Sequence, residues 1–409
     1  MASLRTAGIK VATINSTTSP SEREEILDDL KCGHPLIRLL YVTPEFCTMQ
    51  HFRRLLRIVH SQRELSRIAI DEAHCISEWG HDFRPSFKEL SFFKREFPDV
   101  PLMCLTATAT ARVREDIIAT AGLDQSTLKL FTMTTSRPNL HYEVRFKSDE
   151  DDHYDNFLGW LRAVYSRRSG SAERAAQLET RKERIDNVPG IIYTLFRKDC
   201  EGLAARLRSD GIGAKPYHAG LSNAEKDENL NGWVANRVGF DIIVATTAFG
   251  MGIDKENVRF VVHWQIPKSF EGFYQEAGRA GRDGKASACI LYYSREDRDR
   301  SVSMLARDAS NHGGRRHAGA AAGGSMGTQM SRARSLQALI NYCEATGSCR
   351  HQLICDYFGE KAKAPCDYAC DYHKEGANKL MTRKEKGLAS EEWCMTQREA
   401  GAYAADEYD

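Results

Sequence analysis

A repeated alternation of short apolar runs with helical stretches constrains this chain more than any other feature. The apolar runs of the N-terminal third are Leu39–Val42, Ile68–Ile70 and Leu102–Leu105. Continuous apolar runs of this length are typical of parallel strands that are buried on both faces. Residues with helical periodicity surround them at Ser21–Lys31, Phe87–Phe97 and Ala111–Ala121. Ser21 is followed three residues later by Glu24, a spacing that predicts a capping box at the first helix.

The same alternation returns in the second half of the chain. Strands are predicted at Gly190–Tyr193, Ala214–Tyr217, Asp241–Ala245, Phe260–His263 and Ala288–Tyr292. A helix is predicted at Lys198–Asp210, ended by Gly211. Alternating strands and helices form a parallel sheet with helices on both faces. Because there are two series, we expect two α/β domains, joined near Ser136–Glu143.

Other segments interrupt or follow this pattern. Ser166–Asn187 is charged and polar, which predicts a surface insertion or an extended helix. Arg307–Arg334 is rich in Gly, Ala, Ser and Arg and is expected to be a flexible, solvated loop, with transient phosphate contact as the alternative. Helical periodicity returns at Ser335–Phe358. The tail from Lys374 has few aliphatic residues, and we expect it to be disordered.

Charge and cysteine content limit the class of protein. The net charge is +1, so a nucleic-acid binder of this composition must gather its Lys and Arg on one face. The 12 cysteines come without an apolar leader or a long apolar stretch. We therefore expect reduced thiols, no secretion and no membrane span. The singly scattered cysteines are predicted to be small core residues: Cys32, Cys47, Cys104, Cys200 and Cys289.

An acidic pair ends the predicted strand Ile68–Ile70. Asp71 and Glu72 follow it directly, and a carboxylate at the C-terminal end of a parallel strand lies where α/β sheets bind ligands. Asp71 is suited to hold Mg²⁺ through a water, and Glu72 to orient and deprotonate an attacking water. A surface acidic pair is the alternative, and the residues that follow argue against it.

The next segment alternates aromatic with basic side chains. Its aromatic residues are Trp79, Phe83 and Phe87, and its basic residues are His74, His81 and Arg84. Aromatic rings beside cations suit base stacking and phosphate contact on a single nucleic-acid strand. A packed aromatic cluster under a loop is the alternative. Placed directly after the acidic pair, the segment predicts a sensor that joins DNA binding to ATP chemistry.

Further strand ends carry small polar residues. Thr106 and Thr108 belong to a hydroxyl-rich loop suited to pass signals between domains, although Ser/Thr turns are common. The loop that follows the strand Asp241–Ala245 contains Gly252 and Asp254, and its glycines permit close approach to a phosphate or a nucleic-acid backbone. His218 lies at another strand end.

Two arginines lie in the segment Gln275–Gly284. Arg279 and Arg282 are one helical turn apart if this segment is helical. Two guanidinium groups on one face suit a γ-phosphate, and one of them can act as an arginine finger. A pair of surface ion-pair donors is the alternative.

Cysteines near the C-terminal end have the spacing of metal ligands. Cys349, Cys366, Cys370 and His373 form the pattern C-x16-C-x3-C-x2-H. Three thiolates and one imidazole make a closed, tetrahedral structural zinc site. The alternative is buried free cysteines, which we expect for Cys343 and Cys355.

With these motifs in this order, the chain resembles the RecQ family of superfamily 2 DNA helicases. The resemblance rests on DEAH, SEWGHDFRPSF, LTATAT, YHAGL, ATTAFGMGIDK and QEAGRAGRDG. It implies two RecA-like parallel-sheet motor domains, the first incomplete, followed by a small helical zinc-binding subdomain. The implied bounds are 1–136, 137–300 and 301–373, the last with a flexible insertion, followed by a tail at 374–409.

The resemblance also implies a role for each matching residue. The catalytic residues are Asp71, Glu72, Gln275, Arg279 and Arg282, with Arg282 as the expected finger. Coupling of ATP to DNA falls to His74, Trp79, Thr106, Thr108, Gly252 and Asp254. Contact with DNA falls to Trp79, Phe83, Arg84 and His218. The implied cofactors are ATP, Mg²⁺ and Zn²⁺, the partner is single-stranded DNA or duplex with a 3′ single-stranded region, and the compartment is the nucleus.

The chain departs from the family pattern at two points. His373 stands where the family usually has Cys, and imidazole is an acceptable zinc ligand. The phosphate-binding loop G-x-x-x-x-G-K-[ST] does not occur in the sequence. In the family it precedes the region where Met1 begins, so we expect an N-terminally truncated first domain with exposed sheet edges.

Two functions therefore remain open. One is a 3′–5′ DNA helicase whose activity this chain does not have alone. The other is a non-catalytic DNA-binding or regulatory fragment of a degenerate helicase. An RNA helicase shares the motor logic, but the zinc cluster and the aromatic segment argue against it.

Overall fold

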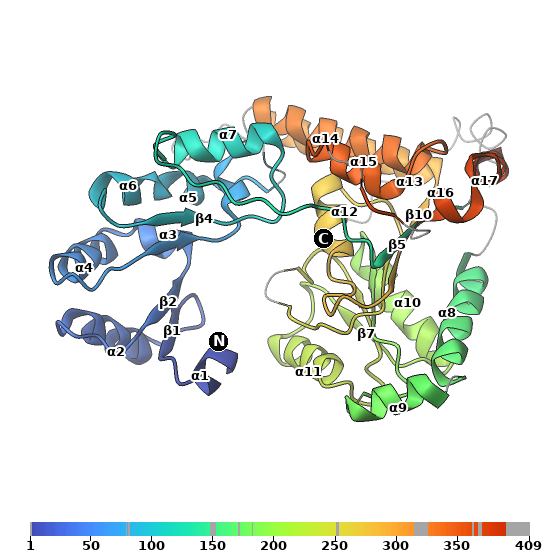
Figure 1. Ribbon diagram of the computed structural model, residues 1–409, viewed down its shortest axis with the longest axis horizontal. Helices are drawn as coiled ribbons and strands as arrows, with labels where there is room; N and C mark the ends of the chain where they lie inside the picture. The colour runs from blue at the N-terminus through green and yellow to red at the C-terminus, as the bar shows by residue number, and fades with distance from the viewer. Residues whose placement is uncertain are drawn as a thin grey trace. The chain divides into compact units, whose positions relative to one another are not determined.

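The computed structural model divides the chain into two compact units, Met1–Thr132 with Ala321–Ser331 and Met133–Ala320 with Arg332–Asp409. It describes residues 2–78, 80, 82–147, 153–170, 172–181, 183–250, 253–314, 326–361, 364–366 and 370–389. Both units contain parallel strands and helices, which confirms the predicted α/β class (Figure 1). Among the described helices, none combines the length and apolar character needed to cross a membrane.

The first unit contains two separate pairs of parallel strands. β1 (Val11–Ile14) pairs with β2 (Leu39–Val42), and β3 (Ile68–Ile70) pairs with β4 (Leu102–Cys104). The prediction found β2, β3 and β4 but not β1. The helical elements are α1 (Ala2–Thr6), α2 (Pro20–Lys31), α3 (Pro44–Thr48), α4 (Gln50–Ser61), η1 (Ala73–Ile76), α5 (Pro85–Lys88), η2 (Glu89–Ser91), α6 (Phe92–Glu96) and α7 (Ala111–Thr120).

The strands of the first unit are not buried on both faces, as the sequence predicted. Leu39 and Tyr41 of β2 are 38% and 47% exposed, and Met103 of β4 is 41% exposed. Side chains of a strand alternate between its two faces, and helices cover only one face of each pair, so the residues on the other face stay exposed. The core instead gathers between the helices and one side of each pair, with members such as Ile14 and Phe52.

Two helix predictions in this unit are wrong in detail. The N-cap of α2 is Ser19 rather than Ser21, because the Ser19 side chain accepts a hydrogen bond from Glu22 N at 3.2 Å. Pro20 then occupies the first helical position, where its fixed φ is already helical. The helix predicted at Phe87–Phe97 is divided into α5, η2 and α6. The tighter 3-10 turn changes the pitch so that residues on both sides of it, including Phe92, enter the core.

The second unit is built on one fully parallel sheet of six strands in the order β5-β10-β9-β6-β8-β7. The strands are β5 (Leu140–Phe146), β6 (Gly190–Tyr193), β7 (Ala214–Tyr217), β8 (Ile242–Ala245), β9 (Phe260–His263) and β10 (Ser287–Tyr293). The prediction placed five of them within a residue and interpreted β5 as the joint between domains. Strands β6, β8 and β9 are buried along their whole length, as their continuous apolar runs predict.

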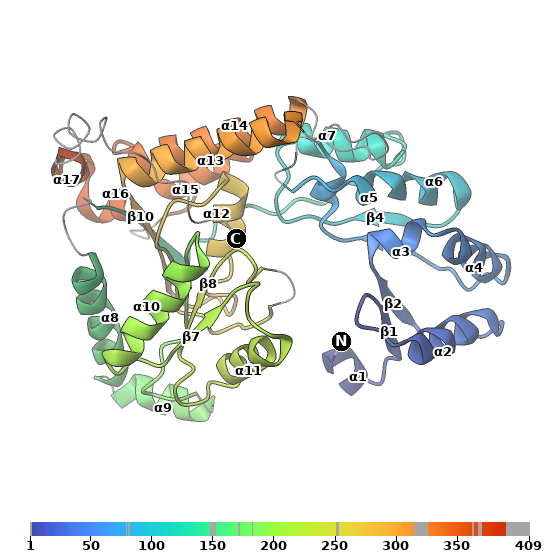
Figure 2. The same cartoon turned by 180° about the vertical axis from the view of Figure 1, so that it is seen from behind.

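Helices cover both faces of this sheet. On one face, α8 (His153–Ser169) and α10 (Arg197–Ser209) pack with a core that includes Phe157 and Leu203; Figure 2 shows α10 beside β7 and β8. On the other face lie α11 (Asn223–Val234) and α12 (Phe270–Ala277). The segment Ser166–Asn187 is mostly helical, since it contains the end of α8 and α9 (Ala172–Thr180).

The C-terminal region is more helical than the sequence predicted. Its helices are α13 (Arg295–Gly314), α14 (Met326–Glu344), α15 (Arg350–Tyr357), α16 (Asp371–Glu375) and α17 (Ala377–Ala389). Arg307–Arg334 is therefore helical at both ends, because α13 and α14 extend into it; residues 315–325 lie outside the described range.

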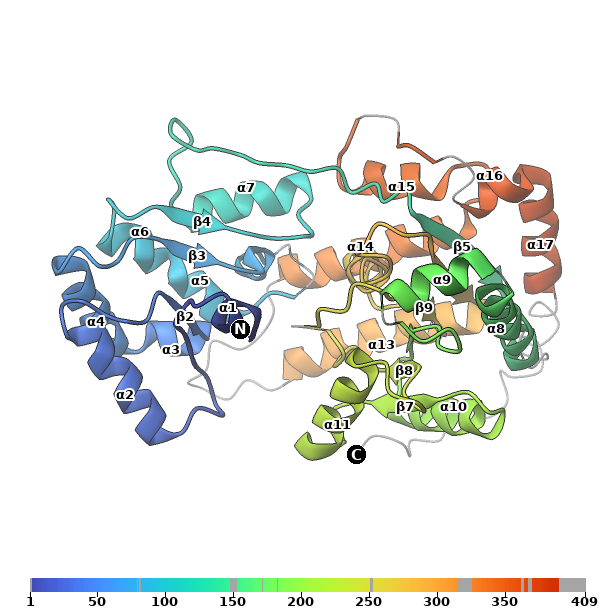
Figure 3. The ribbon, with the colours of Figure 1, turned by 60° about the horizontal axis from the view of Figure 1, so that its bottom comes forward.

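The tail expected to be disordered from Lys374 instead forms α17 and packs onto the protein. Leu380 and Leu388 share one face of this helix and are 0% and 3% exposed. Helices α16 and α17 lie along β5, the strand at the edge of the sheet (Figure 3). At this edge, Val144 N donates to Asp371 Oδ2 and Arg383 donates to Val144 O, so residues of α16 and α17 satisfy backbone groups that would otherwise be unpaired. The remainder of the predicted tail, 390–409, lies outside the described residues.

The cysteines differ in burial. Cys47, Cys200 and Cys289 are buried and Cys104 is partly buried, as predicted for core residues. Cys32 is exposed, because it occupies the C-cap of α2, where that helix ends at the surface. Cys343 and Cys355 are buried free thiols, as expected.

Candidate nucleotide-, DNA- and zinc-binding sites

The acidic pair lies on the turn that follows β3. Asp71 is exposed, and its Oδ1 accepts a hydrogen bond from Glu72 N at 2.9 Å. Glu72 has φ 50° and ψ 41°, a left-handed conformation that residues with a Cβ rarely adopt. This conformation turns the chain from β3 into η1 and directs the Glu72 carboxylate toward His74, whose Nδ1 lies 3.3 Å from Oε2.

His74 connects the acidic pair to the hydroxyl-rich loop. Its ring is 2% exposed, and its Nδ1 lies 3.0 Å from Thr106 Oγ1. Thr106 Oγ1 in turn accepts a hydrogen bond from Thr108 N at 3.2 Å. The two strand ends are joined by Ala73 N, which donates to Leu105 O at 2.8 Å. Residues that the sequence analysis placed in two separate motifs therefore form one connected group.

The aromatic segment folds back on the acidic motif. Arg84 N donates to Cys75 O at 3.0 Å, and the Arg84 guanidinium donates to Asp82 Oδ2 at 2.7 Å. Phe83 and Arg84 are partly exposed, whereas Phe87 is buried and belongs to the core. Trp79 and His81 lie outside the described residues.

Arg279 and Arg282 do not lie on a helix. Helix α12 carries Gln275 and ends at Ala277, and the chain then turns through Gly278–Lys285, which we call the arginine loop. Gly278 is the C-cap residue of α12, and its N–H donates to Tyr274 O at 2.8 Å. The turn that follows passes through Gly281 with φ 56°, a left-handed conformation suited to glycine. The predicted spacing of one helical turn is therefore absent.

The arginine loop nevertheless meets the glycine-containing loop after β8. Arg282 Nη1 donates to Ile253 O at 2.9 Å and to Asp254 Oδ1 at 3.2 Å, and its side chain remains 38% exposed. Arg279 is 6% exposed, and its Nη2 lies 3.8 Å from the position of a Cβ on Gly250. Two further predicted motifs thus come together within the second unit, while Gly252 lies outside the described residues.

His218 is placed differently from a surface DNA contact. It follows β7 but is 3% exposed, and its Nε2 lies 3.0 Å from Glu201 Oε1. The imidazole is thus turned into the unit rather than toward solvent.

The four predicted metal ligands converge. Their ligand atoms, from Cys349, Cys366, Cys370 and His373, all lie within 4.8 Å of one another. The Sγ atoms of Cys349 and Cys370 are 3.9 Å apart, and His373 Nδ1 lies 3.1 Å from Cys366 Sγ. Zn–S bonds of about 2.3 Å at tetrahedral angles require roughly 3.8 Å between sulfur atoms. The donor set therefore fits zinc, and the imidazole presents Nδ1 to it.

The chain holds these ligands from several elements. Cys349 and Cys370 are the N-cap residues of α15 and α16, and Cys370 also forms a bridge to Tyr142 on β5. The hydrogen bond with Cys370 lowers the pKa of the Cys349 thiol. The same hydrogen bond, with burial, raises the pKa of the Cys370 thiol to about 12, so without a metal only Cys349 of these two is shifted toward the thiolate form that binds zinc.

An ion pair that the sequence analysis missed links the two cysteine arms. Arg350 Nε donates to Asp371 Oδ1 at 2.9 Å, and both side chains are 0% exposed. Asp371 Oδ2 also accepts from Val144 N on β5 at 3.0 Å, and Arg350 donates to Tyr342 O. The available signal was a charged residue directly after Cys349 and another directly after Cys370.

Three family models match this chain. A DEAD/DEAH box helicase model matches residues 2–117, a helicase conserved C-terminal domain model matches 172–284, and a RecQ zinc-binding model matches 295–374. Among solved structures, the DUF1998 helicase MrfA bound to DNA and AMPPNP is similar, with a TM-score of 0.50 and 18% identity over 74% of this chain and 40% of that one. That likeness concerns the fold alone.

Curated relatives are RecQ helicases. ATP-dependent DNA helicase Q5 of Mus musculus is 39% identical over 390 residues, which cover 95% of this chain and 37% of the mouse protein. RecQ-like DNA helicase BLM of Xenopus laevis is 36% identical over 377 residues, which cover 90% of this chain and 25% of that protein. The chain thus spans less than half the length of these relatives. On the combined match of both motor regions and the zinc-binding region, the chain belongs to the RecQ family of DEAD/DEAH-box helicases.

Proposed function

We propose that this chain is part of an ATP-dependent 3′–5′ DNA helicase that acts in DNA repair, recombination and replication in the nucleus. The observation that carries the proposal is the connected group Glu72–His74–Thr106, which ties a water-activating carboxylate to a strand-end loop. A buried histidine between a carboxylate and a hydroxyl is suited to sense small movements of either side. The proposed partner is single-stranded DNA, or duplex with a 3′ single-stranded region.

In the proposed mechanism, this chain supplies carboxylates and guanidinium groups to ATP hydrolysis. Asp71 would hold Mg²⁺, and Glu72 would orient and deprotonate the attacking water. Arg279 and Arg282, with Gln275, face the phosphates. Arg282 is the finger, because its side chain is 38% exposed; its present partners are Ile253 O and the exposed Asp254 carboxylate. When bound, Mg²⁺ neutralises charge that develops on the phosphates.

DNA contact is assigned to the partly exposed residues of the aromatic segment. Phe83 and Arg84, with Trp79, provide stacking and phosphate contact, and Thr108, Gly252 and Asp254 pass the signal on. His218 takes part only if its ring turns out of its buried position beside Glu201. Zinc, held by the four converging ligands, acts as a structural staple rather than in catalysis.

The proposed domain bounds are 1–136 and 137–300 for the motor domains and 301–373 for the zinc-binding subdomain. The six-stranded sheet begins at Leu140 and ends at Tyr293, which supports the second of these ranges. Because α17 packs on β5, we now count residues 377–389 with the folded part of the chain.

The first experiment measures DNA binding and DNA-stimulated ATP hydrolysis by the purified 409-residue chain, with Glu72→Gln as the control. We expect hydrolysis near background, because the sequence contains no G-x-x-x-x-G-K-[ST] loop to grip the phosphates. We expect binding of a fluorescent single-stranded oligonucleotide to persist. Robust hydrolysis that disappears in the control contradicts the expected inactivity, and absence of DNA binding contradicts the assigned DNA contacts.

A second candidate is a non-catalytic DNA-binding or regulatory protein derived from a helicase. Sequencing of the transcript upstream of Met1 distinguishes the two. An in-frame phosphate-binding loop there supports the helicase, and a stop codon in that frame supports the second candidate.

A further inference from the structure

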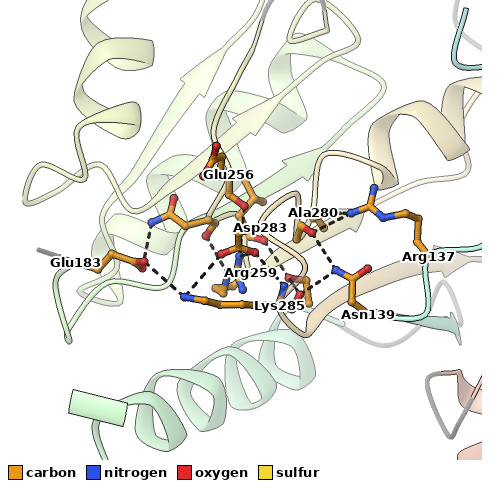
Figure 4. A network of polar contacts seen from close by, with 12 residues as sticks. Arg137, Asn139, Glu183, Glu256, Arg259, Ala280, Asp283 and Lys285 are labelled. Atoms are coloured by element: carbon orange, nitrogen blue, oxygen red, sulfur yellow. Dashed lines mark hydrogen bonds and ion pairs between the residues drawn. The ribbon is translucent and has the colours of Figure 1, made fainter. Parts of the chain in front are cut away.

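The segment Thr134–Asn139, which we call the strap, holds the arginine loop through two side chains. The Arg137 guanidinium donates to three loop carbonyls, those of Gly278 at 3.5 Å, Ala280 at 3.2 Å and Gly281 at 2.9 Å. Asn139 Nδ2 donates to Gly281 O at 2.9 Å and to Lys285 O at 3.0 Å. Figure 4 shows both side chains directed at the loop beside Ala280.

The loop depends on such outside donors. Its carbonyls follow the end of α12, and buried carbonyls need a hydrogen-bond partner wherever the helix or sheet does not supply one. At Gly281, an added Cβ would come within 2.6 Å of Asn139 Nδ2. The Asn139 amide therefore fills the space beside Gly281, the glycine that lies between Arg279 and Arg282, and it fixes the turn there.

Residues outside the strap also hold the C-terminal half of the loop. Arg259 Nη2 donates to Asp283 Oδ1 at 2.6 Å, and Asp283 N donates to Glu256 O at 3.3 Å. Lys285 Nζ lies 3.9 Å from both Asp283 and Glu183 (Figure 4). These contacts surround Asp283, whereas Arg279 and Ala280 lie on the side that the strap supports.

The strap is itself fixed by the zinc-binding region. Thr135 N donates to Glu360 Oε1 at 2.5 Å, and Thr134 Oγ1 donates to Glu360 Oε2 at 2.8 Å. Ser136 Oγ donates at 3.5 Å to Pro365 O, the carbonyl before the zinc ligand Cys366. The strap therefore has one end bonded next to the predicted zinc site and the other bonded to the arginine loop.

We propose that the strap positions the arginine loop, with Arg137 and Asn139 as positioning residues that determine where the Arg279 and Arg282 guanidinium groups stand. Arg137 is suited to this role because its planar group with five donors can bond several carbonyls at once. The proposal deepens the proposed function, on which it rests for the contact of those arginines with phosphate. Its geometric content is independent of ATP.

The test uses the 409-residue chain with arginine-selective ¹⁵N labelling and amide hydrogen exchange. The variants are Arg137→Ala and Asn139→Ala. The matched controls are Arg208→Ala, which loses a bond to Ala214 O at 2.9 Å, and Asn229→Ala, which loses a bond to Pro216 O at 3.0 Å. These controls remove the same kinds of side chain-to-carbonyl bond elsewhere in the second unit.

We expect amides of the arginine loop to exchange on the order of ten- to a hundredfold faster in Arg137→Ala, from the loss of charged hydrogen bonds. The side-chain N–H signal of Arg282 should move toward that of a free arginine, and the controls should match the parent chain. Arg137→Lys should recover part of both effects, because it keeps the charge without the planar fork.

Unchanged loop exchange and an unchanged Arg282 signal in folded Arg137→Ala and Asn139→Ala would overturn the proposal. A lower melting temperature alone, with the Arg282 signal in place, would also overturn it, because a purely structural bond gives that result. If Arg137→Ala does not fold, Asn139→Ala and Arg137→Lys provide the same comparison. No nucleotide enters the measurement, so a failure of the proposed ATP chemistry is seen separately.

Discussion

Asp371→Asn should destabilise the second unit strongly. The substitution keeps the shape of the side chain but removes the charge that balances Arg350, and both groups are fully buried. Removal of one partner from a buried ion pair costs about 3–5 kcal/mol, because the other charge stays in the interior without compensation. Since domains of this size have about 5–15 kcal/mol of total stability, the change is a large part of the whole.

Urea denaturation followed by tryptophan fluorescence measures the effect. With a slope of about 2–3 kcal/mol per molar urea, the midpoint should fall by roughly 1–2 M. The control is Asp155→Asn, which removes a surface contact with Arg206 at 3.7 Å and leaves a residue 82% exposed. Exposed ion pairs contribute about 0–1 kcal/mol to stability, so the urea midpoint of the Asp155→Asn control should barely change.

A double variant separates charge from packing. Arg350→Met combined with Asp371→Leu removes both charges, and it should be more stable than Asp371→Asn alone because no unpaired charge remains. The reasoning is refuted if Asp371→Asn lies within 1 kcal/mol of the parent chain. It is equally refuted if the double variant loses as much free energy of unfolding as Arg350→Met and Asp371→Leu lose separately, added together.

Three further predictions concern neighbouring features. Gly387→Ala in α17 should destabilise the protein by roughly 1–3 kcal/mol in thermal melts, because the new Cβ would lie 2.5 Å from Phe146 Cβ. The control is Gly202→Ala in α10, which has nothing within 4 Å and should stabilise the protein by about 0.5–1 kcal/mol; equal effects of the two variants would argue against the close packing at Gly387. Burial opposes ionisation of Glu143, but hydrogen bonds from His141 and Arg145 lower the pKa of Glu143 to about 2 from 4.5. The contribution of the Glu143 carboxylate to folding stability should be complete above about pH 4.5 and lost as the pH falls toward 2. Glu143→Gln should therefore make stability depend less on pH on the acid side, and an unaltered dependence would contradict the lowered pKa of Glu143. Zinc measured by atomic absorption should remain near one per chain in His373→Cys and fall in His373→Ala, and chelation should lower the melting temperature of the parent chain; full zinc in His373→Ala would exclude the imidazole as a ligand.

The strands of the second unit were predictable because each carries its own signal. Ile242–Ala245 and Phe260–His263 are uninterrupted and β-branched, which is what a strand with neighbours on both edges requires. The sequence analysis did not predict β5, because its residues from Leu140 to Phe146 alternate between apolar and charged, as suits a strand at the edge of the sheet. Its apolar residues, such as Tyr142 and Val144, are buried in a core that includes residues from the C-terminal helices as well as from α12 and β10.

In the candidate sites, too, some features could be predicted from the sequence and others could not. The metal ligands were predictable from spacing, since a tetrahedral ion needs four donors whatever the path of the chain between them. The link from His74 to Thr106 and the contact of Arg282 with Asp254 join residues 32 and 28 positions apart, and nothing local encodes such pairs. Arg137 and Asn139 were read as part of a joint because their partners are backbone carbonyls, which no residue pattern reveals.

The left-handed backbone at Glu72 lowers the stability of the protein at the residue that supplies the carboxylate of the proposed ATP hydrolysis. A side chain with a Cβ in that conformation costs about 1–3 kcal/mol, and Asn or Gly adopts it more easily. A library of this chain selected only for survival on heating should therefore accumulate Asn or Gly at position 72. Such a library would yield more stable molecules that lack the carboxylate proposed to activate water. Glutamate at position 72 should be kept only where selection acts on a helicase that also contains the phosphate-binding loop.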